Sequence, residues 1–575
     1  MKLSEQDNMI LGIGGGVLLA SSMRIFVSGA YASVEKTFFY GVMFPSALGI
    51  ILFLIASFFV GKMQRKTGAI IITAYAIASL ITDATEYTHL IAAFALPVAL
   101  SLVKEVKVKY IILGLVMDLT LRVLAVGGEP IDFIYTRILL VICILGASYV
   151  LWKGKGQLKS PGFGLYAFAA LLNLGFIYPN AIMRYSGFET CYLLHFVGYS
   201  FVVALAILIS PYLAGNKFTS LLLIAGVFAL FVPPFGIVGI PIALTSALAL
   251  LESVKKGRFG VIGALYFVTV SVLAIGAYVG RDIGIPFMED HLEVLILSST
   301  VVYTLSSRPL VIERPNMREI GVPIAGMIIA SLVVVSAFHV RPVDVETKDE
   351  IIVWTYNIHQ GFAPYKGAFN GNELVKLLKT YSPDVMASQE VVGGMIGNGY
   401  QDIPVLLSAY FGYYYEYSPA VEGTYGVATF SRWPLESIEE RNLKSVGQAR
   451  PAQKIKVLSN GLVLINVHMG LYPEERTLQA EELLEMALKD PAAEIILGDT
   501  NAELHEKAIE LLLTEYYDAF PERPPYTFNW GNVDIENIDY IIIKRGSALK
   551  VKEYGWLLDV EVSDHRPIYV LISKE

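Results

Sequence analysis

The sequence ILGDTN, residues 496–501, decides the fold of the C-terminal part of this chain. Its apolar half predicts a buried strand, and its polar half begins where that strand ends. Asp499 and Asn501 are two residues apart, so both side chains project to the same face of an extended backbone. Each residue alone is also typical of a turn or a helix cap, so the interpretation depends on the rest of the chain.

Five more polar motifs occupy the ends of predicted strands. They are Asn357 in TYNI, Glu390 in SQE, His468 in NVH, Asp539 in IDY, and Asp564 with His565 in SDHRP. The patterns predict strands at 351–358, 385–391, 426–431, 462–467, 494–497, 538–543 and 567–572, with amphipathic helices at 474–489 and 503–513. Each polar residue has an ordinary structural explanation when taken alone. Six motifs in one order are far less probable as coincidences than as one site.

Taken together, the six motifs resemble the ordered motif set of the endonuclease/exonuclease/phosphatase superfamily, which includes exonuclease III, DNase I and neutral sphingomyelinase. The resemblance covers nearly all of residues 351–575. It implies that the C-terminal domain is an α/β four-layer β-sandwich (DNase I-like). It also implies that this domain hydrolyses phosphate esters.

Hydrolysis of a phosphate ester requires a cation against the phosphoryl oxygens, an activated water and stabilisation of the leaving oxygen. The domain offers carboxylate and amide oxygens but no cysteine. This supply suits a hard cation, Mg²⁺ or alternatively Mn²⁺, better than Zn²⁺. The resemblance implies that Glu390 is the main metal ligand, with Asn357 and Asp564 beside it.

The resemblance implies that five residues are catalytic: His468, Asp499, Asn501, Asp539 and His565. Asp539 is expected to fix the tautomer of His565, and His468 is expected to contact the phosphate and to be a candidate acid. The sequence leaves open whether Asp499 or His565 activates the water. His359 lies two residues beyond Asn357 and is a weaker candidate for the lining of the same pocket.

The first 340 residues have a different composition. The chain is 54% hydrophobic with a mean hydropathy of +0.55, and apolar runs of about twenty residues stop near Val340. About thirteen helices are predicted, near 9–31, 38–61, 68–82, 88–103, 110–127, 133–152, 163–180, 190–213, 218–233, 235–251, 260–280, 293–305 and 320–340. We therefore predict a polytopic α-helical membrane domain over 1–340, a linker over 341–350 and a catalytic domain over 351–575.

Basic and acidic connecting segments alternate along this membrane domain. The basic clusters lie at 62–66, 104–109, 153–159, 255–258 and 308–318. Short loops rich in Lys and Arg mark the cytoplasmic side. With thirteen spans, the N-terminus is predicted to be cytoplasmic and the catalytic domain extracytoplasmic. Within the spans, Asp118 and Arg122 are four residues apart and are expected to neutralise each other.

Charge and cysteine content restrict the function. From Val345 onward the chain has 20 Lys and Arg against 34 Asp and Glu, a net charge of −14. Proteins that bind nucleic acid through its phosphates use clustered Lys and Arg, so this balance counts against nucleic acid as a partner. Cys143 and Cys191 both lie in apolar stretches, which excludes a disulfide framework and a thiolate metal site.

Many spans followed by this type of domain also resemble, in arrangement alone, the GPI-anchor lipid-remodelling family of cell-wall biogenesis. A tethered domain meets membrane substrates at high effective concentration. The leading hypothesis is therefore a membrane-anchored phosphodiesterase or phosphoesterase that acts on a phospholipid, glycolipid or GPI-type lipid. The alternatives are an extracytoplasmic membrane-tethered nuclease and a non-catalytic lipid-binding or transport protein.

Overall fold

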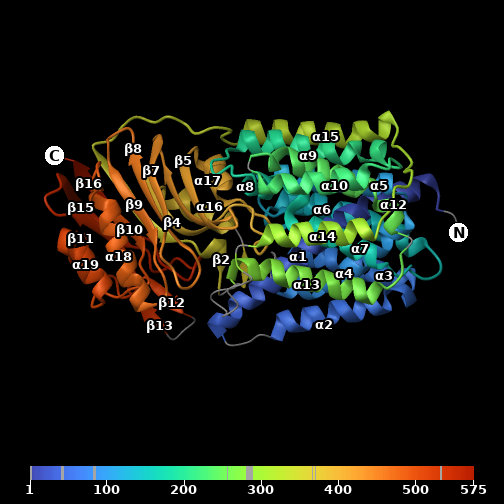
Figure 1. Ribbon diagram of the computed structural model, residues 1–575, viewed down its shortest axis with the longest axis horizontal. Coiled ribbons are helices and arrows are strands. Elements are labelled where there is room, and N and C mark those ends of the chain that lie inside the picture. The colour runs from blue at the N-terminus through green and yellow to red at the C-terminus, as the bar shows by residue number, and fades with distance from the viewer. Residues whose placement is uncertain are drawn as a thin grey trace.

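The computed structural model describes residues 3–40, 44–81, 86–232, 234–255, 257–279, 289, 291–364, 367–369, 371–530 and 534–574. Figure 1 shows two parts beside each other: helices that run along the long axis, and a β-rich part beyond one end of them. The N-terminus lies at the opposite end of the helices, and the C-terminus lies in the β-rich part.

The N-terminal part is a bundle of helices that form along the apolar runs. Its main helices are α1 Glu5–Tyr40, α2 Phe44–Phe59, α3 Arg65–Ile81, α4 Glu86–Glu105, α5 Val108–Leu124, α6 Ile134–Lys153, α7 Phe163–Leu171, α8 Pro179–Tyr185, α9 Leu193–Leu213, α10 Thr219–Phe228, α11 Gly236–Ala249, α12 Leu251–Val254, α13 Gly260–Val279, α14 Leu292–Leu305 and α15 Met317–Ala337. Each of the thirteen predicted segments coincides with helix in the described residues.

Not every helix is long enough to span a bilayer. By length and composition, six helices are able to cross a membrane, and the pair α7 and α8, bent by 67°, would add a seventh. Four further apolar helices are shorter. The bundle therefore has the character of a multi-pass membrane region, and the count of thirteen complete crossings stays a prediction.

Charged side chains inside the bundle pair with one another. Arg24 of α1 lies 2.6 Å from Asp118 of α5 and 2.9 Å from Glu129, and all three are buried. The expected pairing of Asp118 with Arg122 is therefore wrong: Arg24 reaches Asp118 from the neighbouring helix, and Arg122 lies 3.7 Å from Glu129. Pairing removes the large cost of an isolated charge in an apolar interior.

The C-terminal part contains two six-stranded sheets. The first has the order β15-β16-β1-β4-β6-β5 and the second β11-β14-β10-β9-β8-β7. Their strands are β1 Glu350–Asn357, β4 Val385–Val392, β5 Tyr414–Val421, β6 Tyr425–Ser431, β7 Leu435–Leu443, β8 Arg450–Val457, β9 Val463–His468, β10 Ile495–Asp499, β11 Tyr516–Asp518, β14 Asp539–Lys544, β15 Leu549–Trp556 and β16 Ile568–Lys574. All seven predicted strands are present.

The two sheets pack face to face. Val353 and Val385 of the first sheet share one buried cluster with Leu464, Leu497 and Ile541 of the second. Helices α16 Gly371–Tyr381 and α17 Ile403–Phe411 lie on the outer side of the first sheet, and α18 Pro473–Leu488 and α19 Lys507–Glu515 cover the second. This order of helix, sheet, sheet and helix confirms the predicted four-layer β-sandwich.

A segment between β4 and α17 fixes the sandwich to the bundle. Arg122 donates to the carbonyl of Tyr400 at 2.6 Å, and the Tyr400 ring stacks on Tyr178 with the ring centroids 4.0 Å apart. Arg184 of α8 and Asp402 form an ion pair at 2.9 Å, and their side chains are only 1% and 0% exposed. The junction is therefore a buried interface with polar and aromatic contacts.

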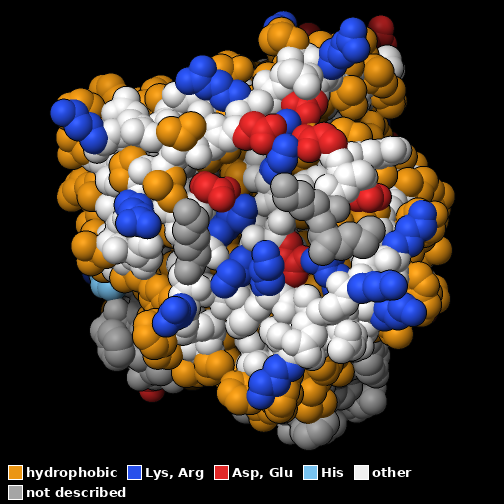
Figure 2. Space-filling model, turned by 90° about the vertical axis from the view of Figure 1, so that its right-hand side faces the viewer, with side chains coloured by type: hydrophobic (Ala, Val, Ile, Leu, Met, Phe, Trp, Pro, Cys, Tyr) orange, Lys and Arg blue, Asp and Glu red, His pale blue; other side chains and the backbone are white. Residues whose placement is uncertain are grey.

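The end of the bundle away from the sheets is rich in basic residues. Figure 2 shows Lys and Arg side chains across this end, with acidic side chains among them. Lys104 donates to the carbonyl of Gly257 at 3.3 Å, and Lys107 lies 3.0 Å from Glu313, so three of the five basic clusters meet here. The basic clusters and the sheets therefore occupy opposite ends of the bundle.

Candidate active site

Strand register gathers polar residues from both sheets at one edge. In the second sheet, Asp499 at the end of β10 is paired with His468 at the end of β9 and with Asp539 at the start of β14. In the first sheet, Asn357 at the end of β1 is paired with Gln389 of β4. Asn357 Nδ2 donates to Asp499 Oδ2 at 2.8 Å, so the two sheets meet through these side chains.

Unusual backbone conformations direct several of these side chains. Glu390 has φ +53° and Asn501 has φ +49°, both in the left-handed region, and Glu390 lies in a bulge between Ser388 and Val391. Gly498 has φ +149°, and a Cβ there would lie 1.9 Å from the carbonyl oxygen of Val467. Such conformations cost roughly 1–3 kcal/mol each and concentrate at functional sites.

Asp499 lies between two histidines. Its Oδ2 is 3.5 Å from Nε2 of His565 and 3.6 Å from Nε2 of His468. On the far side of the His565 ring, Nδ1 lies 2.8 Å from Asp539 Oδ2. The contact between Asp539 and His565 has the geometry that fixes an imidazole tautomer, and all four side chains are buried.

The charges of this cluster change its pKa values. Burial alone would lower the pKa of His565, but the carboxylates around it, Asp539 foremost, raise it to about 10. Burial raises the pKa of Asp499 to about 7; the charge of His565 opposes this shift and that of Asp539 adds to it. Burial and then the charge of Arg450 hold the pKa of His468 well below its usual value. The cavity therefore combines a charged imidazole with a neutral one.

Arg450, at the start of β8, is a site residue that sequence reasoning missed. Its Nη1 lies 2.8 Å from Nε2 of His468, and the side chain is buried. The informative signal would have been the pairing of β8 with β9, the strand that ends in His468. That pairing is not visible in a local sequence pattern.

The three predicted metal ligands belong to one hydrogen-bonded group. Asn357 Nδ2 donates to Glu390 Oε1 at 3.1 Å. The hydroxyl of Ser563 bonds to the backbone carbonyl of Asn357 at 2.8 Å and to Asp564 Oδ1 at 3.0 Å. Ser563 therefore links the loop that carries Asp564 to the end of β1.

The donor atoms fit a divalent cation. One ligand atom each from Asp499, Asp539 and His565 lies within 4.8 Å of the other two. Asp539 Oδ1 is buried without a hydrogen-bond partner among the described residues. A buried carboxylate oxygen without a partner is costly, and a bound cation would satisfy it. The two carboxylates of this trio offer metal donors beside the predicted set of Asn357, Glu390 and Asp564.

Most of the predicted residues face one cavity of about 220 Å³. Its lining includes Glu390, His468, Asp499, Asn501, Asp564 and His565, together with the weaker candidate His359. Asn357 and Asp539 lie behind this lining and bond to Asp499 and His565. The structure therefore brings all eight predicted site residues together.

The opposite wall of the cavity comes from the helical bundle. Tyr31 and Glu35 of α1 and Val279 of α13 all line it. None of the three was predicted from the sequence. Their distance along the chain from the catalytic motifs leaves no local pattern that would identify them.

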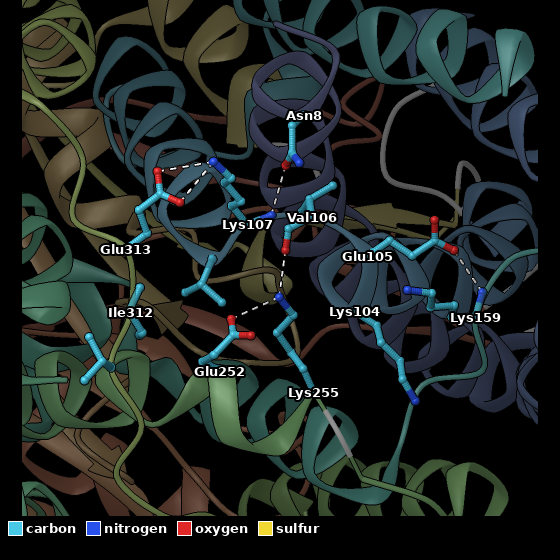
Figure 3. Close-up of a pocket in the computed structure, with 12 residues that line it drawn as sticks. Asn8, Lys104, Glu105, Val106, Lys107, Lys159, Glu252, Lys255, Ile312 and Glu313 are labelled. Carbon is cyan, nitrogen blue, oxygen red and sulfur yellow. Dashed lines mark hydrogen bonds and ion pairs between the residues drawn. The ribbon is translucent and has the colours of Figure 1, made fainter. Parts of the chain in front are cut away.

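A second cavity, of about 550 Å³, lies at the basic end of the bundle (Figure 3). Two of its lysines have these partners: Lys255 donates to the carbonyl of Val106 and to Glu252, and Lys107 pairs with Glu313. It contains no grouping like that at the strand ends among the residues that the structure describes. The grouping of candidate metal-binding and catalytic side chains lies instead at the junction of the two parts.

Comparisons with known proteins found similarity in the C-terminal part of the chain. Residues 354–565 match the Endonuclease/Exonuclease/phosphatase family. The curated "Uncharacterized protein YbhP" of Escherichia coli (strain K12) is 28% identical over 242 residues, which cover 38% of this chain and 93% of that protein.

Two solved structures are similar to the C-terminal part. An endonuclease/exonuclease/phosphatase from Bacteroides vulgatus has 19% identity and a TM-score of 0.32, over 40% of this chain and 100% of that one. The human Nocturnin catalytic domain with bound sulfate has 20% identity and a TM-score of 0.32, over 40% of this chain and 97% of that one.

Proposed function

We propose that this protein is a membrane-anchored, metal-dependent phosphodiesterase or phosphoesterase, because residues 354–565 match the endonuclease/exonuclease/phosphatase family. Its substrate is a lipid-linked phosphate ester, in a phospholipid, a glycolipid or a GPI-type lipid. It acts on the extracytoplasmic face of the membrane.

The composition of the cavity wall carries this proposal. Tyr31, Glu35 and Val279 belong to helices whose other residues form an apolar bundle, so the catalytic cavity opens where the sandwich meets that bundle. A lipid held in a bilayer presents its phosphate at such a junction. The net charge of −14 in the C-terminal part and this enclosed position both count against a polynucleotide substrate.

The residues of the site have complementary roles in this proposal. Glu390, Asp564 and the carboxylates of Asp499 and Asp539 supply the donors for Mg²⁺ or Mn²⁺. Such a cation supplies electrostatic stabilisation of the phosphoryl oxygens. Asp539 orients His565 through the 2.8 Å contact, and Asp499 accepts the proton of the attacking water, because the charged His565 has no free lone pair for it.

His468 and Asn501 complete the set. Burial and then the charge of Arg450 lower the pKa of His468, so this side chain is better suited to a hydrogen bond with the phosphate than to transferring a proton as an acid. Asn501 shares the cavity with Asp499, and its backbone N–H donates to Asp499 Oδ1 at 2.9 Å. Asn501 thereby holds the Asp499 carboxylate toward the reacting groups.

The proposed orientation depends on charge. Basic connecting segments lie at the end of the bundle away from the sandwich (Figure 2), and short basic segments face the cytoplasm. This supports a cytoplasmic N-terminus and an extracytoplasmic catalytic domain. Accessibility labelling of single cysteines at the two ends tests that orientation.

A substrate comparison tests the proposed function. The full-length protein in lipid nanodiscs with Mg²⁺ is given short-chain phospholipids or plasmid DNA, and products are quantified by mass spectrometry and gel electrophoresis. We expect the phospholipid to be hydrolysed at least about tenfold faster than DNA is nicked. Faster nicking of DNA would identify a nuclease. Lipid binding without hydrolysis of either substrate would support the non-catalytic alternative.

Removal of divalent metal is expected to abolish activity. Dialysis against EDTA should lower the hydrolysis rate at least about 100-fold, because charge stabilisation at the phosphoryl group is lost. Millimolar Mg²⁺ or Mn²⁺ should restore the rate, since the donors are mostly carboxylates. Undiminished activity after EDTA treatment, or recovery with Zn²⁺ alone, would contradict the proposed cation.

A further inference from the structure

Helix α1 is longer than a membrane crossing requires. Its 36 residues extend about 54 Å at about 1.5 Å per residue, whereas the hydrocarbon core is about 30 Å thick. At its start, Glu5 lies 2.9 Å from Lys107 at the basic end of the bundle. Near its other end, Tyr31 and Glu35 reach the wall of the catalytic cavity. One continuous helix therefore connects the basic end of the bundle to the catalytic cavity.

Glu35 is joined to the predicted metal ligand Asp564 through one imidazole. Oε2 of Glu35 lies 3.4 Å from Nε2 of His359, and Nδ1 of His359 lies 3.3 Å from Oδ1 of Asp564. The three side chains are only 12%, 7% and 8% exposed. The His359 ring thus lies between two carboxylates that belong to the two different parts of the chain.

The backbone around His359 is held in a conformation that non-glycine residues rarely adopt. His359 has φ +43° and Gln360 has φ +58°. The backbone N–H of His359 donates to Asn357 Oδ1 at 2.9 Å, and the side chains of Gln360 and Glu35 both interact with the Tyr31 hydroxyl. Contacts with β1 on one side and α1 on the other therefore maintain this turn, as strained functional turns require.

We propose that Glu35 of the membrane helix is a positioning residue of the catalytic cavity, which holds His359, and through it Asp564, in place for a divalent cation. The proposal rests on the proposed metal-dependent phosphoesterase function and adds to it. Carboxylates and imidazoles behind metal ligands fix ligand orientation, and their loss lowers metal affinity or activity about 10–100-fold. In this proposal the metal site is complete only when α1 packs against the sandwich, because Glu35 belongs to α1 and Asp564 belongs to the sandwich.

Metal binding by the full-length protein tests this proposal. Mn²⁺ alone is titrated calorimetrically into the wild type, Glu35→Ala and Glu35→Gln in nanodiscs. We expect Glu35→Ala to bind Mn²⁺ about 10–100-fold more weakly, and Glu35→Gln to recover part of that loss because its amide oxygen still accepts a hydrogen bond from His359. The Mn²⁺ concentration for half-maximal hydrolysis of bis(4-nitrophenyl) phosphate should rise by the same factor, whereas KM for the ester should change less than about threefold.

Glu5→Ala provides a matched control, because it makes the same substitution on the same helix at the opposite end. It should bind Mn²⁺ like the wild type. Equal weakening by Glu5→Ala and Glu35→Ala, or wild-type affinity in Glu35→Ala, would overturn the role of Glu35. A wild type that neither binds Mn²⁺ nor hydrolyses any ester would instead overturn the proposed function, so the two failures are distinguishable.

Discussion

Asp499→Asn is expected to lower kcat for phosphate ester hydrolysis roughly 1000-fold, within the range of lost general acid–base catalysis. The carboxylate lies 3.5 Å from His565 and 3.6 Å from His468, and it accepts a hydrogen bond from Asn357. Asparagine keeps the shape but removes the charge, so the variant can neither accept a proton nor balance the charge of His565. KM should change little, because the carboxylate acts on the reacting groups.

The control for this experiment is Glu510→Gln, which neutralises an exposed carboxylate on α19, outside the catalytic cavity. It should retain wild-type kcat and unfold at the temperature of the wild type within about 2 °C, as expected for a surface substitution. A wild-type rate in Asp499→Asn would remove Asp499 from the reaction. The site would then have to be sought among the other residues of the cavity.

Arg184→Met is expected to lower the free energy of unfolding by about 3–5 kcal/mol, because it leaves the charge of Asp402 buried without a partner. The ion pair at 2.9 Å is almost fully enclosed, and it joins α8 of the bundle to the start of α17 in the sandwich. Thermal unfolding in detergent, followed by tyrosine and tryptophan fluorescence, measures the effect. A fall of several degrees is expected.

The matched control is Lys376→Met, which breaks the exposed pair with Glu373 on α16. Exposed pairs contribute about 0.2–1 kcal/mol, so the unfolding temperature should hardly move. If Arg184→Met and Lys376→Met behaved alike, the junction would not be a structural part of the folded protein. The docked position of the sandwich, on which the role of Glu35 depends, would then lose its support.

The strands that carry the site follow directly from local patterns. Buried runs ending in Asn357, His468 and Asp499 predicted β1, β9 and β10, and the order of the motifs predicted the sandwich. The strand β7 was not predicted, because Leu435–Leu443 is mostly polar and lies at a sheet edge. Edge strands bury too little apolar surface to leave a strong periodic signal.

Other parts of the site depend on contacts between distant residues. Glu35 precedes His359 by more than 300 positions, and no periodicity relates a helix end to a catalytic turn. The pairing of Asp118 with Arg24 was missed for the same reason, since helical spacing reveals only partners on the same helix. Long-range pairs of this kind are decided by how helices and sheets pack.

By itself, the sequence determined the division into an apolar helical part and a β-sandwich, and the residues at the strand ends. These properties depend on periodicity and composition, which short stretches of chain already contain. Only the tertiary structure showed that α1 lines the cavity and that Arg450 lies within hydrogen-bond distance of His468. It also showed that a buried ion pair joins the bundle to the sandwich. These contacts join segments far apart in the chain, and only the packing of the whole fold brings them within bonding distance.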